Sequence, residues 1–545
     1  MIDYSKKEYS TDILVIGGGV AAVFAATRAV KNGAKVLMID KGSVGRSGQS
    51  PFATAFAVYD PDSTGERASG ERSDWQKLMY ENGKGVNNPY YLDAFMDYSK
   101  GVYDELLEWG ATDVGFGGVL RKQIQSQDIE LLERTMMTNL LKENDKVVGA
   151  TGFNLDSEEA VVVKAKAVIL CTGAGGFKPN GFQVRSLTFD GDAMAYRIGA
   201  KISGKEYTDG HFNYEDTPAY CWGQWSGMWE RGLPSITEGP MDGGGDAVAI
   251  TDCIEVHENG VSTSSSDMQG GPPSDEEGEG QSGPPEGESS ETAVATEGQE
   301  GQDGPPSGGR PSGSMSNRIN GASAGLSVHK AEGLFPADNQ CRSNIEGLFA
   351  AGDSLSSMLV GAIYNGVGGF AFAGSGAQGA QAGEVAASYV KDLSEPSVSD
   401  SVIEAALTEM FEPLNNEQGY SPSWVEHLLQ GVLTPYYVLY VKNEERLNAT
   451  LTNIEFYRDH FAVKLRADDF HDLRKAHEVK NMILNAEMKL KSSLFRTESR
   501  GNHYREDYPD RNDDDWLAWV VLQKGDDEAM KVEKFYIKDF AALCV

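Results

Sequence analysis

The chain has few cysteines, no long apolar run and no apolar leader at its first residues. Its five cysteines are scattered, at positions 171, 221, 253, 341 and 544, so no CxxC pair exists. We therefore expect reduced thiols, no metal site, and no iron–sulfur cluster held by this polypeptide. No run of about 18 apolar residues is present, so we expect no membrane-spanning helix. Residues 1–7 lack the apolar core of a secretory signal, and the expected location is the cytoplasm.

Basic residues are also scarce, because 48 Lys and Arg face 82 Asp and Glu, giving a net charge of −34. This balance argues against nucleic acid as a partner. Residues 270–313 hold ten acids, one base (Arg310) and no aromatic residue. Such a segment buries too little apolar surface to fold by itself. We expect a disordered insertion at about 262–316, inert or with a regulatory role.

Residues 13–22 contain an apolar run, a glycine turn and the start of a small-residue helix. Gly17, Gly19 and Ala22 fit the G-x-G-x-x-A pattern, and Asp40 ends the next apolar run at 36–39. Gly17 allows the tight turn, Gly19 lets a pyrophosphate approach the helix N-terminus, and Asp40 can accept hydrogen bonds from a ribose. The pattern predicts a dinucleotide-binding βαβ unit; a glycine turn that binds no nucleotide is the alternative.

The remaining pattern predicts an α/β protein with a helical part near its C-terminus. Residues 74–110 and 128–142 are predicted helices, and the apolar runs 147–150, 160–163 and 167–170 are predicted strands. The last of these runs ends in a second glycine turn, at 172–176. Residues 402–495 are predicted helical, with one apolar core stripe at positions 473, 476, 479, 483, 486, 490 and 494. Short strands are expected around 531–537.

Four segments together resemble one enzyme family. They are the βαβ unit at 13–40, the strand and glycine turn at 168–176, Gly-Leu-Phe-Ala-Ala-Gly-Asp at 347–353, and Glu-Ser-Arg-Gly-Asn-His-Tyr-Arg-Glu-Asp-Tyr-Pro at 498–509 followed by Asp-Asp-Asp-Trp at 513–516. The chain resembles the flavoprotein subunits of the fumarate reductase and succinate dehydrogenase family, which also includes L-aspartate oxidase and the adenylylsulfate reductase α subunit.

The resemblance implies a Rossmann-like FAD-binding domain, residues 1–205 and 326–395, split by a cap of residues 206–325. A helical domain, 396–495, and a small β-containing C-terminal segment, 496–545, follow. FAD is the implied cofactor. Gly48 stands where succinate dehydrogenases carry the histidine that binds the flavin covalently, so a non-covalent cofactor is expected. The implied FAD-binding residues are Gly17, Gly19, Ala22, Asp40, Lys41, Ser47, Gly48, Thr172, Gly173, Asp353 and Asn365.

On the substrate side, the resemblance points to His211 and to the pair Thr237–Glu238; a purely structural histidine is the alternative for His211. Arg310 and Arg318 are the nearest candidates for the family's proton-shuttling arginine. Gly366 stands where relatives carry a carboxylate-binding arginine, and residues 320–323 replace a second histidine segment. A dicarboxylate such as fumarate would lose several charge-assisted hydrogen bonds in such a site.

The cluster Arg500, His503 and Arg505 is interpreted as structural, and the tryptophans at 222, 225 and 229 as a packed helix or an aromatic wall. We expect an FAD-dependent oxidoreductase that reduces or desaturates an activated carbon–carbon bond of a small molecule other than fumarate. Electrons would pass through a separate iron–sulfur or other redox subunit. An adenylylsulfate-reductase-like α subunit is one alternative, favoured by Arg46-Ser47-Gly48. A catalytically inactive flavin-binding scaffold is another.

Overall fold

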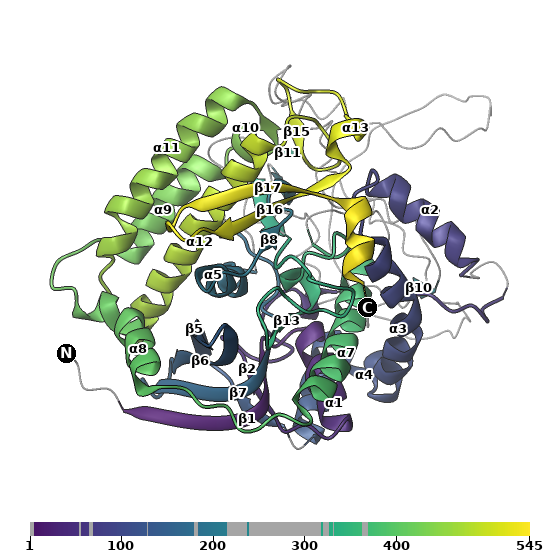
Figure 1. The fold of residues 1–545 in the computed structure, drawn as a ribbon, viewed down its shortest axis with the longest axis horizontal. Coiled ribbons are helices and arrows are strands. Elements are labelled where there is room, and N and C mark those ends of the chain that lie inside the picture. The colour runs from purple at the N-terminus through teal and green to yellow at the C-terminus, as the bar shows by residue number, and fades with distance from the viewer. Residues whose placement is uncertain are drawn as a thin grey trace, which may run out of the picture. The chain divides into compact units, whose positions relative to one another are not determined.

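The computed structural model describes residues 5–53, 56–64, 69–127, 129–178, 184–214, 237–238, 318–319, 326–330, 332–361 and 369–544. All of them fall within one compact unit made of residues 1–261 and 318–545 (Figure 1). The predicted insertion at about 262–316 and the tryptophans at 222, 225 and 229 lie outside the described residues.

A seven-stranded sheet forms the centre of the fold. Parallel pairing joins β4 (Glu130–Leu132), β2 (Val36–Ile39), β1 (Lys6–Ile16) and β7 (Ala160–Leu170) in that order. On the side opposite β1, β7 pairs with two strands. The first half of β7 pairs antiparallel with β6 (Lys146–Asn154), and the last three residues of β7 pair parallel with β13 (Leu348–Ala350). The strand β5 (Thr135–Glu143) then pairs antiparallel with β6. This arrangement confirms the predicted α/β, Rossmann-like fold.

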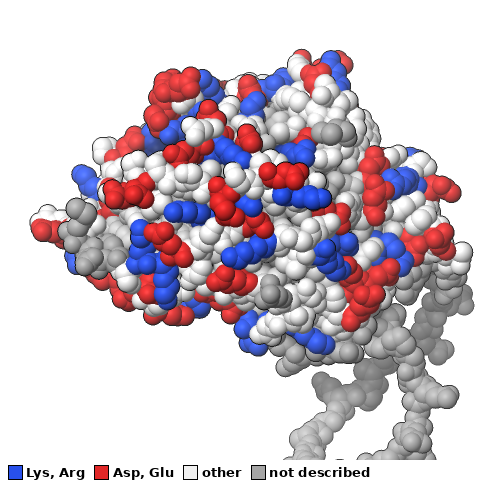
Figure 2. Space-filling model, turned by 60° about the horizontal axis from the view of Figure 1, so that its bottom comes forward, with Lys and Arg blue, Asp and Glu red and all other residues white. Residues whose placement is uncertain are grey.

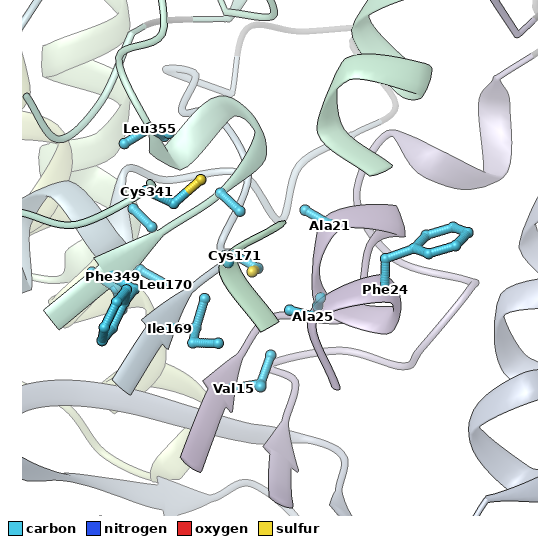
Figure 3. Close-up of a cluster of buried hydrophobic side chains, with 14 of the residues drawn as sticks. Val15, Ala21, Phe24, Ala25, Ile169, Leu170, Cys171, Cys341, Phe349 and Leu355 are labelled. Carbon is cyan, nitrogen blue, oxygen red and sulfur yellow. The ribbon is translucent and has the colours of Figure 1, made fainter. Parts of the chain in front are cut away.

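Small residues bring two helices unusually close beside this sheet. Helix α1 (Val20–Lys31) packs against α7 (Phe370–Val390). A Cβ atom on Gly379 would lie 2.2 Å from the carbonyl oxygen of Ala21, and one on Gly383 would lie 2.3 Å from that of Ala25. The glycines of α7 are therefore needed for close helix packing. Figure 3 shows Ala21 and Ala25 beside the strand residues Val15 and Ile169 in the same core.

The predicted helical region 74–110 forms two helices, α2 (Arg72–Asn82) and α3 (Pro89–Glu108), and α4 (Ala111–Ser126) follows. Asn88 caps α3, because its side chain accepts a hydrogen bond from the N–H of Tyr90. Helix α3 packs against α7, and α4 packs against α1. Val102 and Leu106 of α3 are buried in this packing.

The prediction of a helix over 128–142 is wrong, since this segment forms β4 and β5. Its apolar residues recur in pairs about four residues apart, which fits a helix as well as a buried strand. Most of β5 is buried, because both faces of the strand are covered. A strand buried on both faces shows no alternation of apolar and polar residues that would distinguish it from a helix. The pairing partners β2 and β6 decide the outcome, and a local pattern cannot reveal them.

The helical part contains α8 (Asp400–Asn415), α9 (Pro422–Leu433), α10 (Tyr436–Leu439), α11 (Glu444–His460) and α12 (Phe470–Phe495). The predicted stripe on α12 is confirmed: Leu473, Ala476, Val479, Ile483, Ala486 and Leu490 are buried, and Leu494 is partly buried. In Figure 1 these helices form one side of the compact unit.

The C-terminal segment returns to the rest of the fold. Its strands β16 (Ala518–Lys524) and β17 (Met530–Tyr536) form a hairpin, and β16 also pairs with β8 (Ile202–Ser203). The predicted strand around 531–537 is confirmed. The strand β15 (Tyr504–Arg505) pairs with β14 (Val441–Lys442) of the helical part. The shorter elements are η1 (Ser50–Phe52), β3 (Ala57–Val58), α5 (Asp190–Arg197), β9 (Asp209–Tyr214), β10 (Thr237–Glu238), β11 (Arg318–Ile319), β12 (Leu326–Lys330), η3 (Gly352–Ser354), η4 (Ala462–Lys464), α13 (Asp513–Trp516) and η5 (Ile537–Leu543).

Acidic and basic side chains are interspersed over the face shown in Figure 2. Many charged side chains of the described residues form ion pairs, such as Arg134–Asp156 and Lys100–Asp104. Across the described part of the chain, no helix combines the length and the apolar character needed to cross a bilayer.

Candidate cofactor site and substrate side

The glycine turns singled out in the sequence meet at one edge of the central sheet. The N–H of Gly17 donates to the carbonyl of Ile39 at 2.8 Å, and the N–H of Cys171 donates to that of Ile16 at 2.8 Å. The turn after β13 joins them, because the N–H of Ala351 donates to the carbonyl of Leu170 at 3.0 Å. This edge is formed by the carboxyl ends of the parallel strands, where open α/β sheets bind their ligands.

The turn between β1 and α1 leaves space that only glycine can provide. Gly17 has a φ of +131°, and a Cβ atom there would lie 2.1 Å from the carbonyl oxygen of Cys171. Gly19 precedes α1 and supplies no side-chain cap to it. Ala22 is fully buried behind the turn. The N-cap residue of α1 therefore leaves the positive amino end of this helix without a side-chain cap of its own. Ser50 Oγ accepts one of the first N–H groups, that of Val20, at 3.0 Å.

Asp40 presents one carboxylate oxygen to this edge. Its Oδ1 accepts hydrogen bonds from the N–H of Gly42 at 2.6 Å and from the Ser47 hydroxyl at 2.9 Å. Its Oδ2 accepts none from the residues that the structure describes, and a Cβ atom on Gly18 would lie 2.3 Å from it. Burial raises the pKa of Asp40, although the hydrogen bonds from Ser47 and Gly42 act in the opposite direction. Ser47 and the N–H of Gly42 thus orient Asp40 through Oδ1.

Lys41 has protein partners on three sides. Its Nζ donates to Thr188 Oγ1 at 2.9 Å, to Asp190 Oδ2 at 2.7 Å and to Glu478 Oε1 at 2.9 Å. Burial lowers the pKa of Lys41, but the two carboxylates outweigh burial and raise it. Lys41 thereby ties the end of β2 to α12. A cavity of about 340 Å³ opens beside it, lined by Lys41, Gly42, Arg134, Leu155, Ser186, His471 and Arg474. That volume lies at the lower end of small-molecule pockets.

The glycine turn after β7, at 172–176, is hydrogen-bonded to the turn that follows β13. Ser354 Oγ donates to the carbonyl of Gly173 at 3.3 Å, so the Thr172 hydroxyl, 3.0 Å away, donates to Ser354. Asp353 lies in the same short helix, η3, and is partly exposed at this edge. Gly48, which follows Ser47 in the chain, has a φ of +73°, and no atom lies within 4 Å of a Cβ built on it.

The predicted substrate-side residues fall on two separate strand pairings, of which the structure describes the main chain. The strand β9 lies between β11 and β12, with His211 opposite Ser327 and Tyr214 opposite Arg318. His211 and Arg318 are therefore brought onto one small sheet. Thr237 and Glu238 instead pair with β3, opposite Ala57 and Val58. Arg310 and Asn365 lie outside the described residues.

Sequence reasoning did not single out His329. It lies in β12, where the pairing with β9 shifts register between Val328 and Lys330, opposite the residues that precede His211. The five-residue run 326–330 is too short to predict its partner strand, so only the fold reveals this neighbour. In the part of the chain that the structure describes, no three His, Cys, Asp or Glu side chains gather as metal ligands would.

Comparison with known proteins matches both ends of the chain. Residues 12–178 match the family described as FAD dependent oxidoreductase, and residues 429–542 match the family described as fumarate reductase flavoprotein C-term. An uncharacterized FAD-dependent oxidoreductase of Methanocaldococcus jannaschii is 26% identical, covering 94% of this chain and 96% of its own. A fumarate reductase (CoM/CoB) subunit of Methanothermobacter marburgensis is 24% identical over 95% of this chain and 97% of its own.

Solved structures share the fold over nearly the whole chain. Adenylylsulfate reductase from Archaeoglobus fulgidus gives a TM-score of 0.70 at 18% identity, covering 98% of this chain and 97% of its own. Mycobacterium smegmatis Sdh1 in complex with UQ1 gives 0.69 at 18% identity, covering 97% and 94%. FAD is therefore the cofactor of this chain. The chain is an FAD-dependent oxidoreductase that is similar to the flavoprotein subunits of fumarate reductase and succinate dehydrogenase.

Proposed function

We propose that this oxidoreductase binds FAD non-covalently and reduces or desaturates an activated carbon–carbon bond of a small organic molecule other than fumarate. The observation that carries the proposal is the cradle formed by Gly17, the open amino end of α1 and the Oδ2 atom of Asp40. The cofactor supplies hydride exchange when bound. Gly48 presents no side chain to which a flavin could be joined, which supports non-covalent binding.

Each part of the cradle has a separate task in the proposal. The N-terminus of α1 at Gly19 would hold the pyrophosphate, and Asp40, oriented by Ser47, would hold the adenosine ribose. Thr172, Gly173 and Asp353 would contact the middle of the cofactor, with Lys41 and Asn365 as further contacts. In this arrangement residues 1–205 and 326–395 form the cofactor domain, residues 206–325 the cap, and residues 396–495 and 496–545 the helical and C-terminal parts.

The substrate side needs a proton donor and groups that polarise the substrate. We assign these roles to His211, Thr237 and Glu238, with Arg318 or Arg310 as the proton-shuttling arginine. The sheet pairing of β9 with β11 and β12 supports His211 and Arg318, and it adds His329 as a candidate. Gly366 carries no guanidinium, which argues against a substrate with two carboxylates.

Electrons would enter or leave through a separate redox protein. The five scattered cysteines give this chain no cluster-binding motif of its own. The Methanothermobacter marburgensis relative, which this chain matches along nearly its whole length, is itself named as one subunit of a fumarate reductase (CoM/CoB). An iron–sulfur protein would be the matching partner.

The proposal is tested with purified protein reduced by dithionite under anaerobic conditions. Reoxidation of the flavin is followed after adding fumarate, crotonate, cinnamate or adenylylsulfate. Reoxidation by a monocarboxylic enoate and not by fumarate supports the proposal. Reoxidation by fumarate alone contradicts the substrate assignment. Reoxidation by adenylylsulfate would identify an adenylylsulfate-reductase activity, and inertness toward all four compounds would indicate a scaffold. Acid precipitation should release all flavin into the supernatant; flavin retained by the precipitate would contradict non-covalent binding.

A further inference from the structure

The short segment between β8 and β9, residues 204–208, is buried, and most of its polar contacts come from distant parts of the chain. It leads directly into β9, the strand that contains His211. Strands normally satisfy their carbonyl groups by pairing with a neighbour. The carbonyl oxygens of residues 205, 206 and 207 accept hydrogen bonds from lysine side chains instead.

Lys489 supplies two of these contacts from α12. Its Nζ lies 2.9 Å from the carbonyl oxygen of Tyr207 and 3.4 Å from that of Lys205. It also lies 3.4 Å from Thr208 Oγ1. The side chain of Lys489 is fully buried, so these contacts are shielded from water and are stronger than the same contacts at a surface.

Lys442 of β14 holds the residue in between. Its Nζ donates to the carbonyl oxygen of Glu206 at 2.6 Å and lies 3.0 Å from His503 Nδ1. The same Nδ1 lies 3.3 Å from the carbonyl oxygen of Glu206, and His503 Nε2 lies 3.3 Å from the carbonyl oxygen of Arg496. Burial, helped by Lys442, Arg496 and Arg505, holds the pKa of His503 well below its ordinary value. A neutral His503 therefore orients Lys442.

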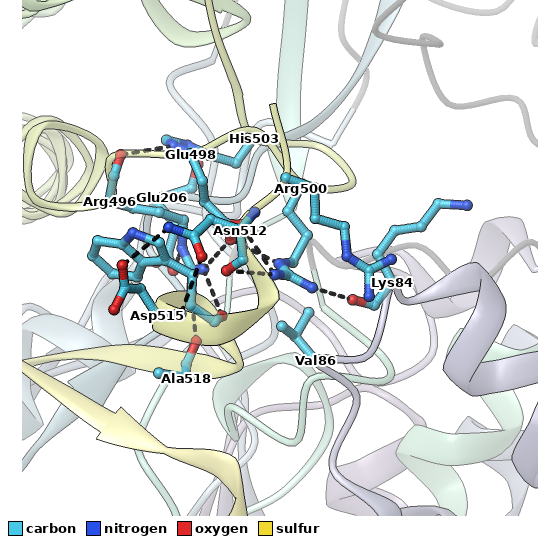
Figure 4. A network of polar contacts seen from close by, with 12 residues as sticks. Lys84, Val86, Glu206, Arg496, Glu498, Arg500, His503, Asn512, Asp515 and Ala518 are labelled. Carbon is cyan, nitrogen blue, oxygen red and sulfur yellow. Dashed lines mark hydrogen bonds and ion pairs between the residues drawn. The ribbon is translucent and has the colours of Figure 1, made fainter. Parts of the chain in front are cut away.

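The side chains of the segment are fixed as well. Glu206 Oε1 accepts from Arg496 Nε at 2.9 Å, and Arg496 Nη1 donates to Glu498 Oε1 at 2.7 Å. Glu498 in turn binds Arg500, whose Nη2 donates to the half-exposed Asp513 at 2.8 Å. Figure 4 shows Glu206, Arg496, Glu498 and Arg500 in this network, with His503 beside it. At the other end, Lys205 forms a buried ion pair with Asp192 of α5.

We propose that Lys442 and Lys489 are positioning residues, which fix the main chain entering β9 and thereby set the position of His211. The inference rests on the proposed function only for the role of His211. The contacts of Lys442 and Lys489 with the carbonyl groups of residues 205–207, called the lysine clamp below, do not depend on that role. The two lysine side chains divide the three successive carbonyl groups between them: Lys489 contacts those of residues 205 and 207, and Lys442 contacts that of residue 206. Their anchors, β14 and α12, belong to the helical part, so the clamp makes the geometry of β9 depend on that part of the chain.

Hydrogen–deuterium exchange of the FAD-loaded full chain tests the clamp without any turnover. In Lys489→Met and in Lys442→Met, the amides of residues 209–214 should exchange at least tenfold faster than in the wild type. Lys489→Arg keeps a charged donor and should restore exchange to within about threefold. Lys178→Met is the matched control, because Lys178 is also a buried lysine, but its ion pairs are with Glu478 and Glu426 instead of with residues 204–208.

Unchanged exchange at 209–214 in both methionine variants would overturn the proposal, and so would an equal acceleration in Lys178→Met, which would reveal general destabilisation. If Lys489→Met does not fold, Thr208→Val removes one acceptor of Lys489 without removing the buried charge, and a smaller acceleration at the same amides is expected. The flavin content is recorded for each variant. A colourless wild type would contradict the proposed function and leave the exchange comparison valid, so the two failures are distinguishable.

Discussion

The carbonyl oxygen of Cys171 lies 2.1 Å from the point where a side chain on Gly17 would begin. The contact follows from the parallel pairing of β1 with β7, which places Ile16 opposite Leu170 and runs both chains into their turns side by side. Gly17 also has a φ of +131°, a conformation that residues with a side chain rarely adopt. The first glycine of the turn is thus required by the sheet as well as by the cofactor.

We predict that Gly17→Ala removes bound FAD and destabilises the protein by about 3 kcal/mol or more, since a methyl group would both clash with Cys171 and adopt a strained φ. Denaturant unfolding and the flavin absorbance of the purified protein measure the two effects. Gly33→Ala is the control: Gly33 also has a positive φ, +86°, but a Cβ atom there meets nothing within 4 Å. That variant should keep its flavin and lose about 1 kcal/mol. Equal losses in the two variants would contradict the steric argument.

Asp40→Asn should weaken FAD binding roughly 10- to 100-fold, because a hydrogen bond to a charged acceptor contributes about 1.5–3 kcal/mol and the amide is neutral. Titration of the flavin-free protein with FAD gives the dissociation constant. Asp12→Asn changes another carboxylate, one on β1 that pairs with Lys166 instead of facing the glycine turn, and should leave the constant unchanged. If Asp40→Asn binds FAD as tightly as the wild type, Oδ2 does not contact the ribose.

The central fold could be predicted from the sequence where the local residue pattern and the packing of the finished sheet favour the same structure. Residues 13–16 and 36–39 are continuous apolar runs because both faces of a parallel sheet are covered, and the glycine turn follows directly. The stripe on α12 was equally clear, since a helix of 26 residues repeats its pattern many times. The segment 128–142 failed because β4 and β5 depend on partners at 37–39 and 146–154, which no local pattern encodes.

The same limit applies to the site. The proximity of Asp40 to the turn at residues 17–19 could be predicted, since the turn and the acid belong to one short βαβ unit. The hydrogen bonds of Lys41 to Asp190 and Glu478 could not, because they join residues separated by 149 and 437 positions. His329 was missed for a similar reason, as its proximity to β9 arises from antiparallel pairing between strands that are distant in the sequence.

The buried ion pairs around Arg496 should be far more important for stability than ion pairs at the surface. Arg496 is completely buried, and its removal in Arg496→Met would leave the buried carboxylates of Glu206 and Glu498 without this partner. We predict a loss of about 3–5 kcal/mol in the free energy of unfolding. Lys100→Met breaks the exposed pair with Asp104 on α3 and should change it by less than about 1 kcal/mol. Similar denaturant midpoints for both variants would contradict this difference.

Lys489 should make the stability of the protein depend on pH above neutrality. Burial, reinforced by Lys205, lowers the pKa of Lys489 from 10.5 to about 7, although nearby carboxylates oppose the shift. The charged groups that face Lys489 are Lys205, Glu206, Asp192, Glu332 and Lys442. Between pH 7 and 10.5 the unfolded chain binds a proton at this lysine that the folded chain has released. The contribution of Lys489 to stability therefore rises with pH across this window and is flat below it.

The measurement is the free energy of unfolding of the wild type and of Lys489→Met at several pH values from about 6 to about 9.5. The difference, wild type minus variant, should be constant below about pH 6.5 and then increase toward a slope of about 1.4 kcal/mol per pH unit. Lys489→Arg, which keeps its proton throughout this range, should show no such increase relative to Lys489→Met. Parallel curves for the wild type and Lys489→Met would mean that Lys489 stays charged in the folded protein, because a group that is protonated in both states cannot link folding to pH.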